Sequence, residues 1–165
     1  SKAADRLSAQ VRDKTMHRQY IAAVRGDAGE AAELCDFLLK DGRTNMVCAV
    51  PANTPGAKDA KLRYQKCGEA DGLTLVRVRL FTGRSHQIRV QLSHAGLPIW
   101  GDARYGGGRP GQQIALWAHS LTFEHPTLKT PVAIESLPPP EGAWRKFPEY
   151  ASKNSPEYAK ERFDV

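Results

Sequence analysis

Between residues 73 and 96 the spacing of the apolar residues changes, and this change restricts the possible folds more than any other feature of the chain. Residues 73–81 (LTLVRVRLF) alternate between apolar and polar side chains, the pattern of a half-buried β-strand. After a turn at Gly83, the apolar residues of segment 84–96 recur at helical spacing, and Gly96 is a typical C-terminal stop. The stretch therefore predicts a strand, a glycine turn and a helix.

Elsewhere the sequence predicts mainly strands. We expect a helix over residues 1–16, strands over 17–26, 46–50, 62–67, 114–126 and 130–138, a hairpin turn at 68–72 and a glycine-rich surface loop over 97–113. Residues 29–40 are ambiguous, because Leu34, Phe37 and Leu38 also fit a helix. Since strands and helices do not alternate regularly, the predicted class is α+β, with a mixed, largely antiparallel sheet and flanking helices.

The composition favours one domain with an anionic partner. The chain has 165 residues, 41% of them hydrophobic, and a formal net charge of +6 at pH 7, which favours nucleic acid as the partner. The three cysteines show neither zinc spacing nor a disulfide framework: Cys35, Cys48 and Cys67. No apolar run approaches the roughly 18 residues of a membrane span. We expect a cytoplasmic monomer that does not bind membranes.

Metal and serine chemistry are poorly supported. The histidines form no zinc-binding pattern, and His86 and His94 are more than two helical turns apart on the predicted helix. The segment GRSHQ lacks the second glycine of the serine-hydrolase motif GxSxG. Ser85 is expected to help cap the helix instead. We therefore expect no metal ion and no cofactor.

The glycine-rich and aromatic residues favour structural roles. Residues 105–111 (YGGGRPG) match no nucleotide-binding pattern, although Arg104 and Arg109 could contact a phosphate backbone. The tryptophans are expected to pack in the core or at its edge: Trp100, Trp117 and Trp144. We expect Arg77 and Arg79 to lie on a solvated strand face, with RNA contact as the alternative.

The strand–turn–helix unit itself has the features of a site. The N–H groups at the start of the helix can receive a phosphate, and Arg84 and His86 stand at that end. Arg89 lies beside the apolar side of the helix, where an unpaired guanidinium is costly, so it should meet a carboxylate. That pair is either a structural salt bridge or an arginine that orients a catalytic acid.

Residues 82–106 (TGRSHQIRVQLSHAGLPIWGDARYG) closely resemble the hallmark segment of the Rlu/Rsu-type (RluA-like) RNA pseudouridine synthases, TGR[ST]HQ[IL]RxHLxxxGxPIxGDxxYG. Gln91 stands where that pattern usually has histidine. Residues 1–26 are similar to the helix and strand that carry the family's K-x-Y element, and residues 114–139 resemble its final strand pair, LHAxxLxFxHP. The resemblance covers roughly residues 1–140.

The resemblance implies a fold, a reaction and site residues. Members isomerise uridine to pseudouridine in structured ribosomal or transfer RNA, flipping the uridine into the pocket and using no cofactor. By motif position, Tyr20 would stack on the base and serve in proton removal at C5, and Arg89 would pair with a nucleophilic aspartate. Ile88 would line the pocket under the base. The residues that would help hold the RNA or the turn are Arg84, His86 and Gln87.

The HRLD motif that carries the family's aspartate is absent from these 165 residues, and Asp5, Asp13 and Asp102 do not match it. We expect the aspartate upstream of Ser1, residues 1–140 to be the C-terminal portion of a catalytic domain whose fold is incomplete at its N-terminal side, and residues 141–165 to be a tail with short helical segments. Without the nucleophile this chain alone is expected to be inactive. The alternative is an RNA-binding module that has lost catalysis.

Overall fold

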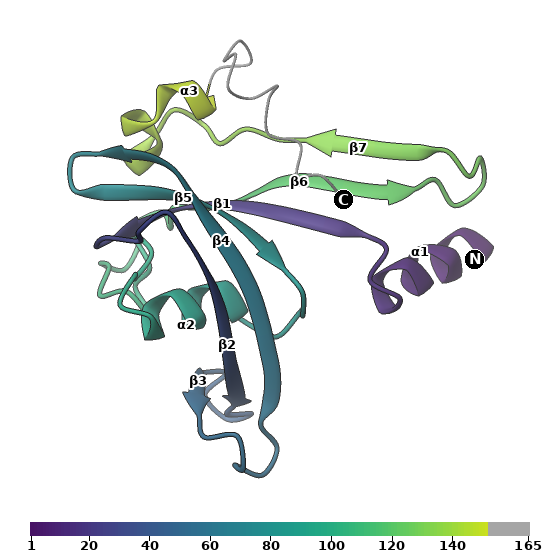
Figure 1. Cartoon of the computed structure of the whole chain (residues 1–165), viewed down its shortest axis with the longest axis horizontal. Helices are drawn as coiled ribbons and strands as arrows, with labels where there is room; N and C mark the ends of the chain where they lie inside the picture. Colours follow the sequence, from purple (N-terminus) through teal and green to yellow (C-terminus); the bar gives the residue numbers. More distant parts are fainter. Residues whose placement is uncertain (152–165) are drawn as a thin grey trace.

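A computed structural model describes residues 1–151 and contains one seven-stranded sheet in the order β3-β2-β4-β5-β1-β6-β7 (Figure 1). The elements are α1 (Lys2–Arg12), β1 (His17–Arg25), β2 (Ala31–Lys40), β3 (Val47–Val50), β4 (Lys58–Ala70), β5 (Leu73–Leu80), α2 (Gln87–His94), β6 (Leu116–Glu124), β7 (Pro131–Glu135), the 3-10 helix η1 (Gly142–Lys146) and α3 (Pro148–Ala151). All pairs of neighbouring strands in this part of the chain are antiparallel. The predicted α+β class is confirmed.

Two local features differ from the sequence expectation. The ambiguous segment is the strand β2, because it pairs with both β3 and β4, which is a tertiary influence that local spacing does not reveal. The β4–β5 turn is also shorter than predicted: Ala70 pairs with Leu73, and the two turn residues Asp71 and Gly72 have φ of 50° and 74°. Positive φ at both central residues is the geometry that suits a two-residue hairpin.

Helix α2 covers one face of the sheet, here named the α2 face. Its Val90 packs with Ala60 of β4 in a small buried cluster. Side chains two apart on a strand share a face, so Tyr64 of β4 lies on the α2 face, and so do its successive cross-strand partners Val78 and Tyr20. Tyr20 and α2 therefore lie on the same side of the sheet.

The opposite face is covered by η1 and α3 near the turn of the β4–β5 hairpin (Figure 1). Trp144 and Phe147 are 2% and 1% exposed and belong to the main core cluster. Residues 143–150 thus pack on the sheet, while the rest of the predicted tail, residues 152–165, lies outside the described residues. The division at residue 140 stays a prediction. Trp100 and Trp117 are partly buried against the same cluster, which confirms the predicted packing role of the tryptophans.

Arg77 corrects one prediction. Its side chain was expected on a solvated face but is only 7% exposed, and its cross-strand partner Ile21 is 0% exposed, so this part of β5 lies in the buried centre of the sheet. Arg79, further toward the strand end, is half-buried, with its guanidinium carbon 5.3 Å from the centre of the Phe81 ring.

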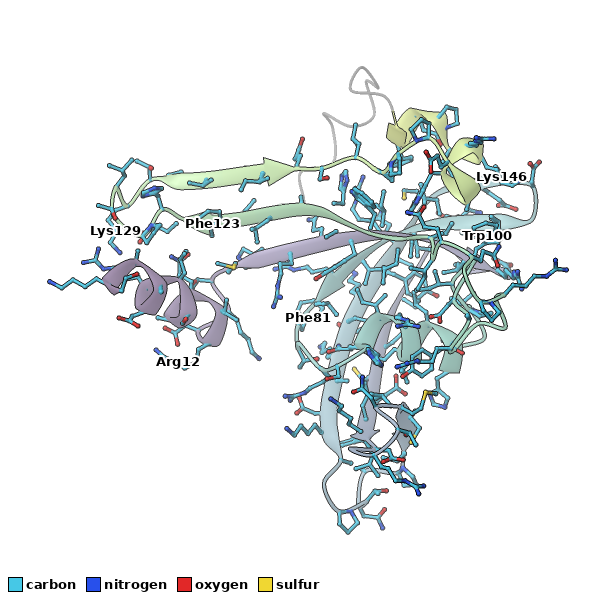
Figure 2. All side chains as sticks on the ribbon, turned by 180° about the vertical axis from the view of Figure 1, so that it is seen from behind. Arg12, Phe81, Trp100, Phe123, Lys129 and Lys146 are labelled. Atoms are coloured by element: carbon cyan, nitrogen blue, oxygen red, sulfur yellow. The ribbon has the colours of Figure 1, made fainter. Side chains whose placement is uncertain are left out.

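Helix α1 lies beside the turn between β6 and β7 (Figure 2). Gln10 and Glu124 exchange two hydrogen bonds of 2.8 Å, from the Gln10 amide to the Glu124 carbonyl and from the Glu124 N–H to the Gln10 side chain. Arg6 donates to the Pro126 carbonyl at 2.7 Å. These polar contacts attach the predicted N-terminal helix to the far end of the sheet.

The segment expected to be a surface loop is partly buried. Ile99 and Asp102 are each 1% exposed, and Ile99 forms a bridge with Val24 at the end of β1. The N–H of Trp100 donates to the carbonyl of Ala23 at 2.9 Å. The first part of segment 97–113 therefore extends the edge of the sheet, and this position fixes Asp102 beside α2.

Candidate functional site

The turn before α2 is held by a glutamine rather than by a serine cap. His86 is the N-cap residue, with φ of 53° and no side-chain cap, so the expectation that Ser85 caps the helix is wrong. The Gln87 side-chain oxygen instead accepts 2.9 Å hydrogen bonds from the Arg84 N–H and the Thr82 hydroxyl. Ser85 lies one residue too early to meet the free N–H groups.

The far end of α2 closes as predicted. Gly96 has φ of 77°, and its N–H donates to the Ser93 carbonyl while the N–H of Leu97 donates to the Leu92 carbonyl. This is the Schellman arrangement, in which a glycine with positive φ satisfies the last carbonyls of a helix.

A buried glutamine ties α2 to the sheet. Gln91 is 0% exposed, and its side-chain oxygen accepts from the Gln87 amide at 3.0 Å. Its amide nitrogen donates to the Asp36 carboxylate at 2.8 Å and lies 3.2 Å from the carbonyl oxygens of Leu34 and Ala60. The residue that replaces the family's usual histidine therefore links α2 to β2 and β4.

Replacing Gln91 with leucine is expected to lower the free energy of unfolding by about 2 kcal/mol, because its buried hydrogen bonds with Gln87, Asp36 and the carbonyl groups of Leu34 and Ala60 would be lost. Urea denaturation measures the change. Gln65→Leu, at an exposed position of β4, is the matched control and should change stability by less than about 0.5 kcal/mol. Equal effects of the two substitutions would show that the buried hydrogen bonds contribute little.

The carboxylate that Arg89 requires is Asp102. Arg89 Nε and Nη2 donate to its two oxygens at 2.8 and 2.7 Å. Asp102 is 1% exposed and also accepts the N–H groups of Arg104 and Tyr105, each at 3.0 Å. The predicted pairing is thus confirmed as a structural salt bridge, and a further role in orienting a catalytic acid stays a prediction.

Electrostatics agrees with this geometry. Burial alone would raise the pKa of Asp102, but the hydrogen bonds from Arg89, Tyr105 and Arg104 outweigh it, and the pKa lies below its ordinary value. The hydrogen bond to Asp102 raises the pKa of Arg89. Both groups are therefore ionised at neutral pH.

Tyr105 lies between the turn, β3 and Arg89. Its hydroxyl oxygen accepts the N–H of Val47 at 3.1 Å and is 2.8 Å from His86 Nδ1. Burial and the nearby cations Arg89, Arg104 and Lys40 lower the pKa of His86, which favours the neutral ring, and Nδ1 of a neutral ring can accept a hydrogen bond from the Tyr105 hydroxyl. The Arg89 guanidinium carbon lies 4.9 Å from the centre of the Tyr105 ring.

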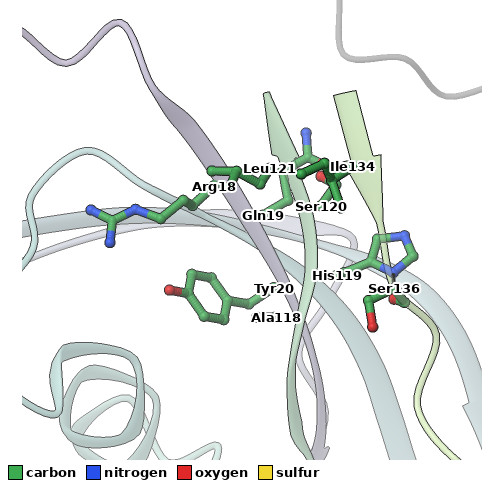
Figure 3. A pocket seen from close by; sticks show the side chains of 9 residues that line it. All are labelled: Arg18, Gln19, Tyr20, Ala118, His119, Ser120, Leu121, Ile134 and Ser136. Carbon is green, nitrogen blue, oxygen red and sulfur yellow. Dashed lines mark hydrogen bonds between the residues drawn. The ribbon is translucent and has the colours of Figure 1, made fainter. Parts of the chain in front are cut away.

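Tyr20 is only partly buried. Its side chain and that of Arg18 extend to one side of β1, while His119 and Ser136 lie toward the other side of the sheet (Figure 3). Within residues 1–151 its hydroxyl has no hydrogen-bond partner, unlike the hydroxyl of the buried Tyr64, which donates to the Ala28 carbonyl at 2.9 Å. Tyr20 therefore does not have the satisfied environment of an ordinary core tyrosine.

The remaining predicted site residues lie around α2. Arg84 donates to the backbone and side chain of Asp59, both at 2.7 Å, and Ile88 is 5% exposed in the core. Arg89 lines a polar pocket whose other walls are Gly101, Asp102, Ala103, Arg104, Gln112 and Ile114. Tyr20 lines a separate, shallow apolar hollow, and the two pockets share no lining residue. The fold brings Tyr20 and Arg89 to one face of the sheet but not into contact.

Asp102 is the site residue that sequence patterns missed as the partner of Arg89. The signal available was the GDARY segment, because an aspartate at the start of a turn accepts N–H groups two and three residues later.

In the described part of the chain, no group of three or more histidine, cysteine or acidic side chains could hold a metal ion. No helix there has the length and apolar composition to cross a membrane.

Comparison with known proteins gives the family. A model described as RNA pseudouridylate synthase matches residues 1–94. Ribosomal large subunit pseudouridine synthase C of Vibrio vulnificus is 31% identical over 138 residues, covering 79% of this chain and 43% of the relative. Its namesake in Yersinia pestis is 34% identical over 139 residues, with the same two coverages of 79% and 43%. The chain thus spans less than half the length of these relatives.

Solved structures share the fold. Human RNA Pseudouridylate Synthase Domain Containing 1 matches with a TM-score of 0.70 and 24% identity over 83% of this chain and 60% of that chain. Human RNA Pseudouridylate Synthase Domain Containing 4 matches with a TM-score of 0.66 and 19% identity over 82% of this chain and 63% of that one. Because the family model covers more than half of its residues, the chain belongs to the RNA pseudouridylate synthase family.

Proposed function

We propose that this chain provides part of the active site of an enzyme that isomerises uridine to pseudouridine in structured RNA. The observation that carries the proposal is the position of two motif residues on the α2 face: Tyr20, whose hydroxyl has no hydrogen-bond partner within residues 1–151, and Arg89, which is held by a buried carboxylate. The names of the Vibrio and Yersinia relatives favour ribosomal RNA as the substrate, with transfer RNA as the alternative.

Arg89 has donors to spare for a second carboxylate. A guanidinium has five N–H donors, and Nε and Nη2 are engaged by Asp102. The side chain is 24% exposed and lines the polar pocket, where Arg104 adds a second positive charge. We infer that the nucleophilic aspartate reaches Arg89 at this pocket from a segment outside these 165 residues.

Tyr20 supplies what the base requires. Its ring is partly exposed for stacking, and its hydroxyl, which no group within residues 1–151 engages, can take part in proton transfer at C5. Arg18 lies nearby on the same strand face, close to Gly83 at the turn before α2. Arg84 and Gln87 support the turn through their own hydrogen bonds, and RNA contact is proposed for the half-buried Arg84 and His86. The proposed enzyme acts in the cytoplasm as a monomer without a cofactor.

Release of tritium from RNA that carries 5-tritiated uridine tests this function. Isomerisation replaces the bond from C5 to hydrogen with a bond from C5 to C1′, so tritium passes to water. A protein that joins this chain to an HRLD-type segment is expected to release one tritium for each uridine converted. RNA binding that weakens with salt but releases no tritium would favour the inactive RNA-binding module instead.

A further inference from the structure

We propose that Asp102 and Tyr105 are positioning residues that fix the direction of the Arg89 guanidinium, so that its free donors face the polar pocket. The inference rests on the proposed function, in which those donors hold the nucleophilic aspartate. It assigns a role to the GDARY segment, whose two side chains contact Arg89 from different directions.

Asp102 fixes one edge of the guanidinium. Two parallel hydrogen bonds to a carboxylate set both the position and the plane of an arginine head group. The carboxylate is itself held by two backbone N–H groups, and the Asp102 carbonyl accepts the N–H groups of Gly106 and Gly108, both at 2.9 Å. Asp102 is thus bound through its side chain and its backbone, and it can fix Arg89 without moving itself.

The glycines after Asp102 keep this segment compact. A Cβ atom at Gly106 would lie 2.7 Å from the Ile99 carbonyl oxygen, and one at Gly108 would lie 2.7 Å from the Gly101 carbonyl carbon. Both distances are too short for any side chain, so glycine is required for the backbone to fold over Asp102. The segment is built for close backbone packing around the carboxylate.

Tyr105 fixes the face of the guanidinium. Its ring lies against Arg89, an arrangement in which a cation is attracted to the aromatic face. The ring cannot easily turn away, because its hydroxyl is hydrogen-bonded to His86 and Val47. The backbone is held as well, since the Tyr105 carbonyl accepts the Ser93 hydroxyl at 2.6 Å. Tyr105 therefore joins β3, the turn and α2 behind the arginine.

The charges leave this pocket able to accept an anion. Arg89 and Arg104 contribute two positive charges and Asp102 one negative charge, so the three side chains leave one net positive charge at the pocket. A carboxylate that enters this pocket would meet a guanidinium that is already oriented. Binding would therefore cost less conformational entropy of the Arg89 side chain. The arrangement therefore allows Arg89 to bind the buried carboxylate of Asp102 and the carboxylate of the nucleophilic aspartate at the same time.

The first test measures positioning without activity. In nitrogen-15 NMR of the chain, the Arg89 side-chain N–H groups are expected to exchange slowly with water and to show hindered rotation. Asp102→Asn and Tyr105→Leu should make these signals exchange fast, and Tyr105→Phe, which keeps the ring, should restore much of the hindrance. Unchanged signals in both Asp102→Asn and Tyr105→Leu would overturn the inference.

The second test measures the consequence in the protein that contains the HRLD-type segment. Asp102→Asn is expected to lower kcat about 100-fold with little change in KM, because the arginine is misplaced by a small distance. The acidic limb of the kcat pH profile should move to higher pH, because a poorly held arginine no longer lowers the pKa of the nucleophile. Asp71→Asn, which loses an exposed ion pair with Lys146, is the matched control and should keep the normal profile.

The outcomes separate the two proposals. If the unsubstituted protein forms no pseudouridine while the Arg89 signals respond as expected, the positioning stands and the function is wrong. If it is active and Asp102→Asn keeps a normal kcat and pH profile, the positioning role is wrong. Should Asp102→Asn fail to fold, Tyr105→Leu gives the same two readouts with the buried carboxylate retained.

Discussion

Replacing Arg89 with methionine is expected to lower the free energy of unfolding by about 3 kcal/mol, and to abolish pseudouridine formation in the enzyme. The substitution leaves the Asp102 carboxylate, 1% exposed, with two backbone N–H groups but without its cation. Removing one partner of a buried pair is costly, because the other charge keeps its desolvation penalty. Urea denaturation measures the stability and tritium release measures the activity.

Two variants make this result specific. Arg63→Met removes an exposed arginine that has no ion pair within residues 1–151, and it should change stability by less than about 0.5 kcal/mol. The double variant Arg89→Met/Asp102→Asn removes the unpaired buried charge of Asp102, while the asparagine oxygen can still accept the backbone N–H groups. It should therefore recover part of the lost stability. A stable, active Arg89→Met protein would contradict both the structural and the catalytic role of Arg89.

Replacing Gly101 with alanine is expected to cost about 3 kcal/mol or more, because two penalties add at this position. The residue has φ of 77°, which L-residues with a Cβ seldom adopt, and the new Cβ would lie 2.3 Å from the Gln113 carbonyl oxygen. The obstructing atoms belong to the backbone, so the loop that carries Asp102 must move. Urea denaturation of the variant measures the cost.

Gly107→Ala is the matched control for this substitution. Its φ of 65° is similar, but no atom lies within 4 Å of the added Cβ, so only the cost of the left-handed conformation, about 1 kcal/mol, remains. The difference between the two variants therefore isolates the collision at Gly101. Equal losses of stability in the two variants would show that the loop between Gly101 and Gln113 can move at little cost.

Local patterns predict those parts of the fold that depend on neighbours in sequence. Alternation predicts β1 and β5, and helical spacing with Gly96 predicts α2 and its end. The segment at β2 could not be assigned in this way, because residues four apart share a side in a helix and in a strand alike. Pairing with β3 and β4 decides between the two, and that pairing is long-range.

In the site, too, local sequence reveals what a residue requires but not which distant residue supplies it. That Arg89 requires a carboxylate follows from the cost of an unpaired charge, but Asp102 is 13 residues away in a segment expected on the surface. Its burial depends on the bridge between Ile99 and Val24, which no local pattern reveals. Arg77 was misplaced for a related reason: alternation gives the face of a strand but not what covers that face.

Tritium release by Tyr20→Phe measures whether the α2 face carries part of a uridine-isomerising site. The control is Tyr64→Phe, which removes a hydroxyl from a buried tyrosine on the same face, where it donates to the Ala28 carbonyl. In the protein that includes the HRLD-type segment, we expect release to fall at least about 100-fold in Tyr20→Phe, at unchanged RNA affinity, and to stay normal in Tyr64→Phe. Normal release by Tyr20→Phe would mean that the hydroxyl of Tyr20 takes no part in isomerisation and that this side of the sheet does not carry the site.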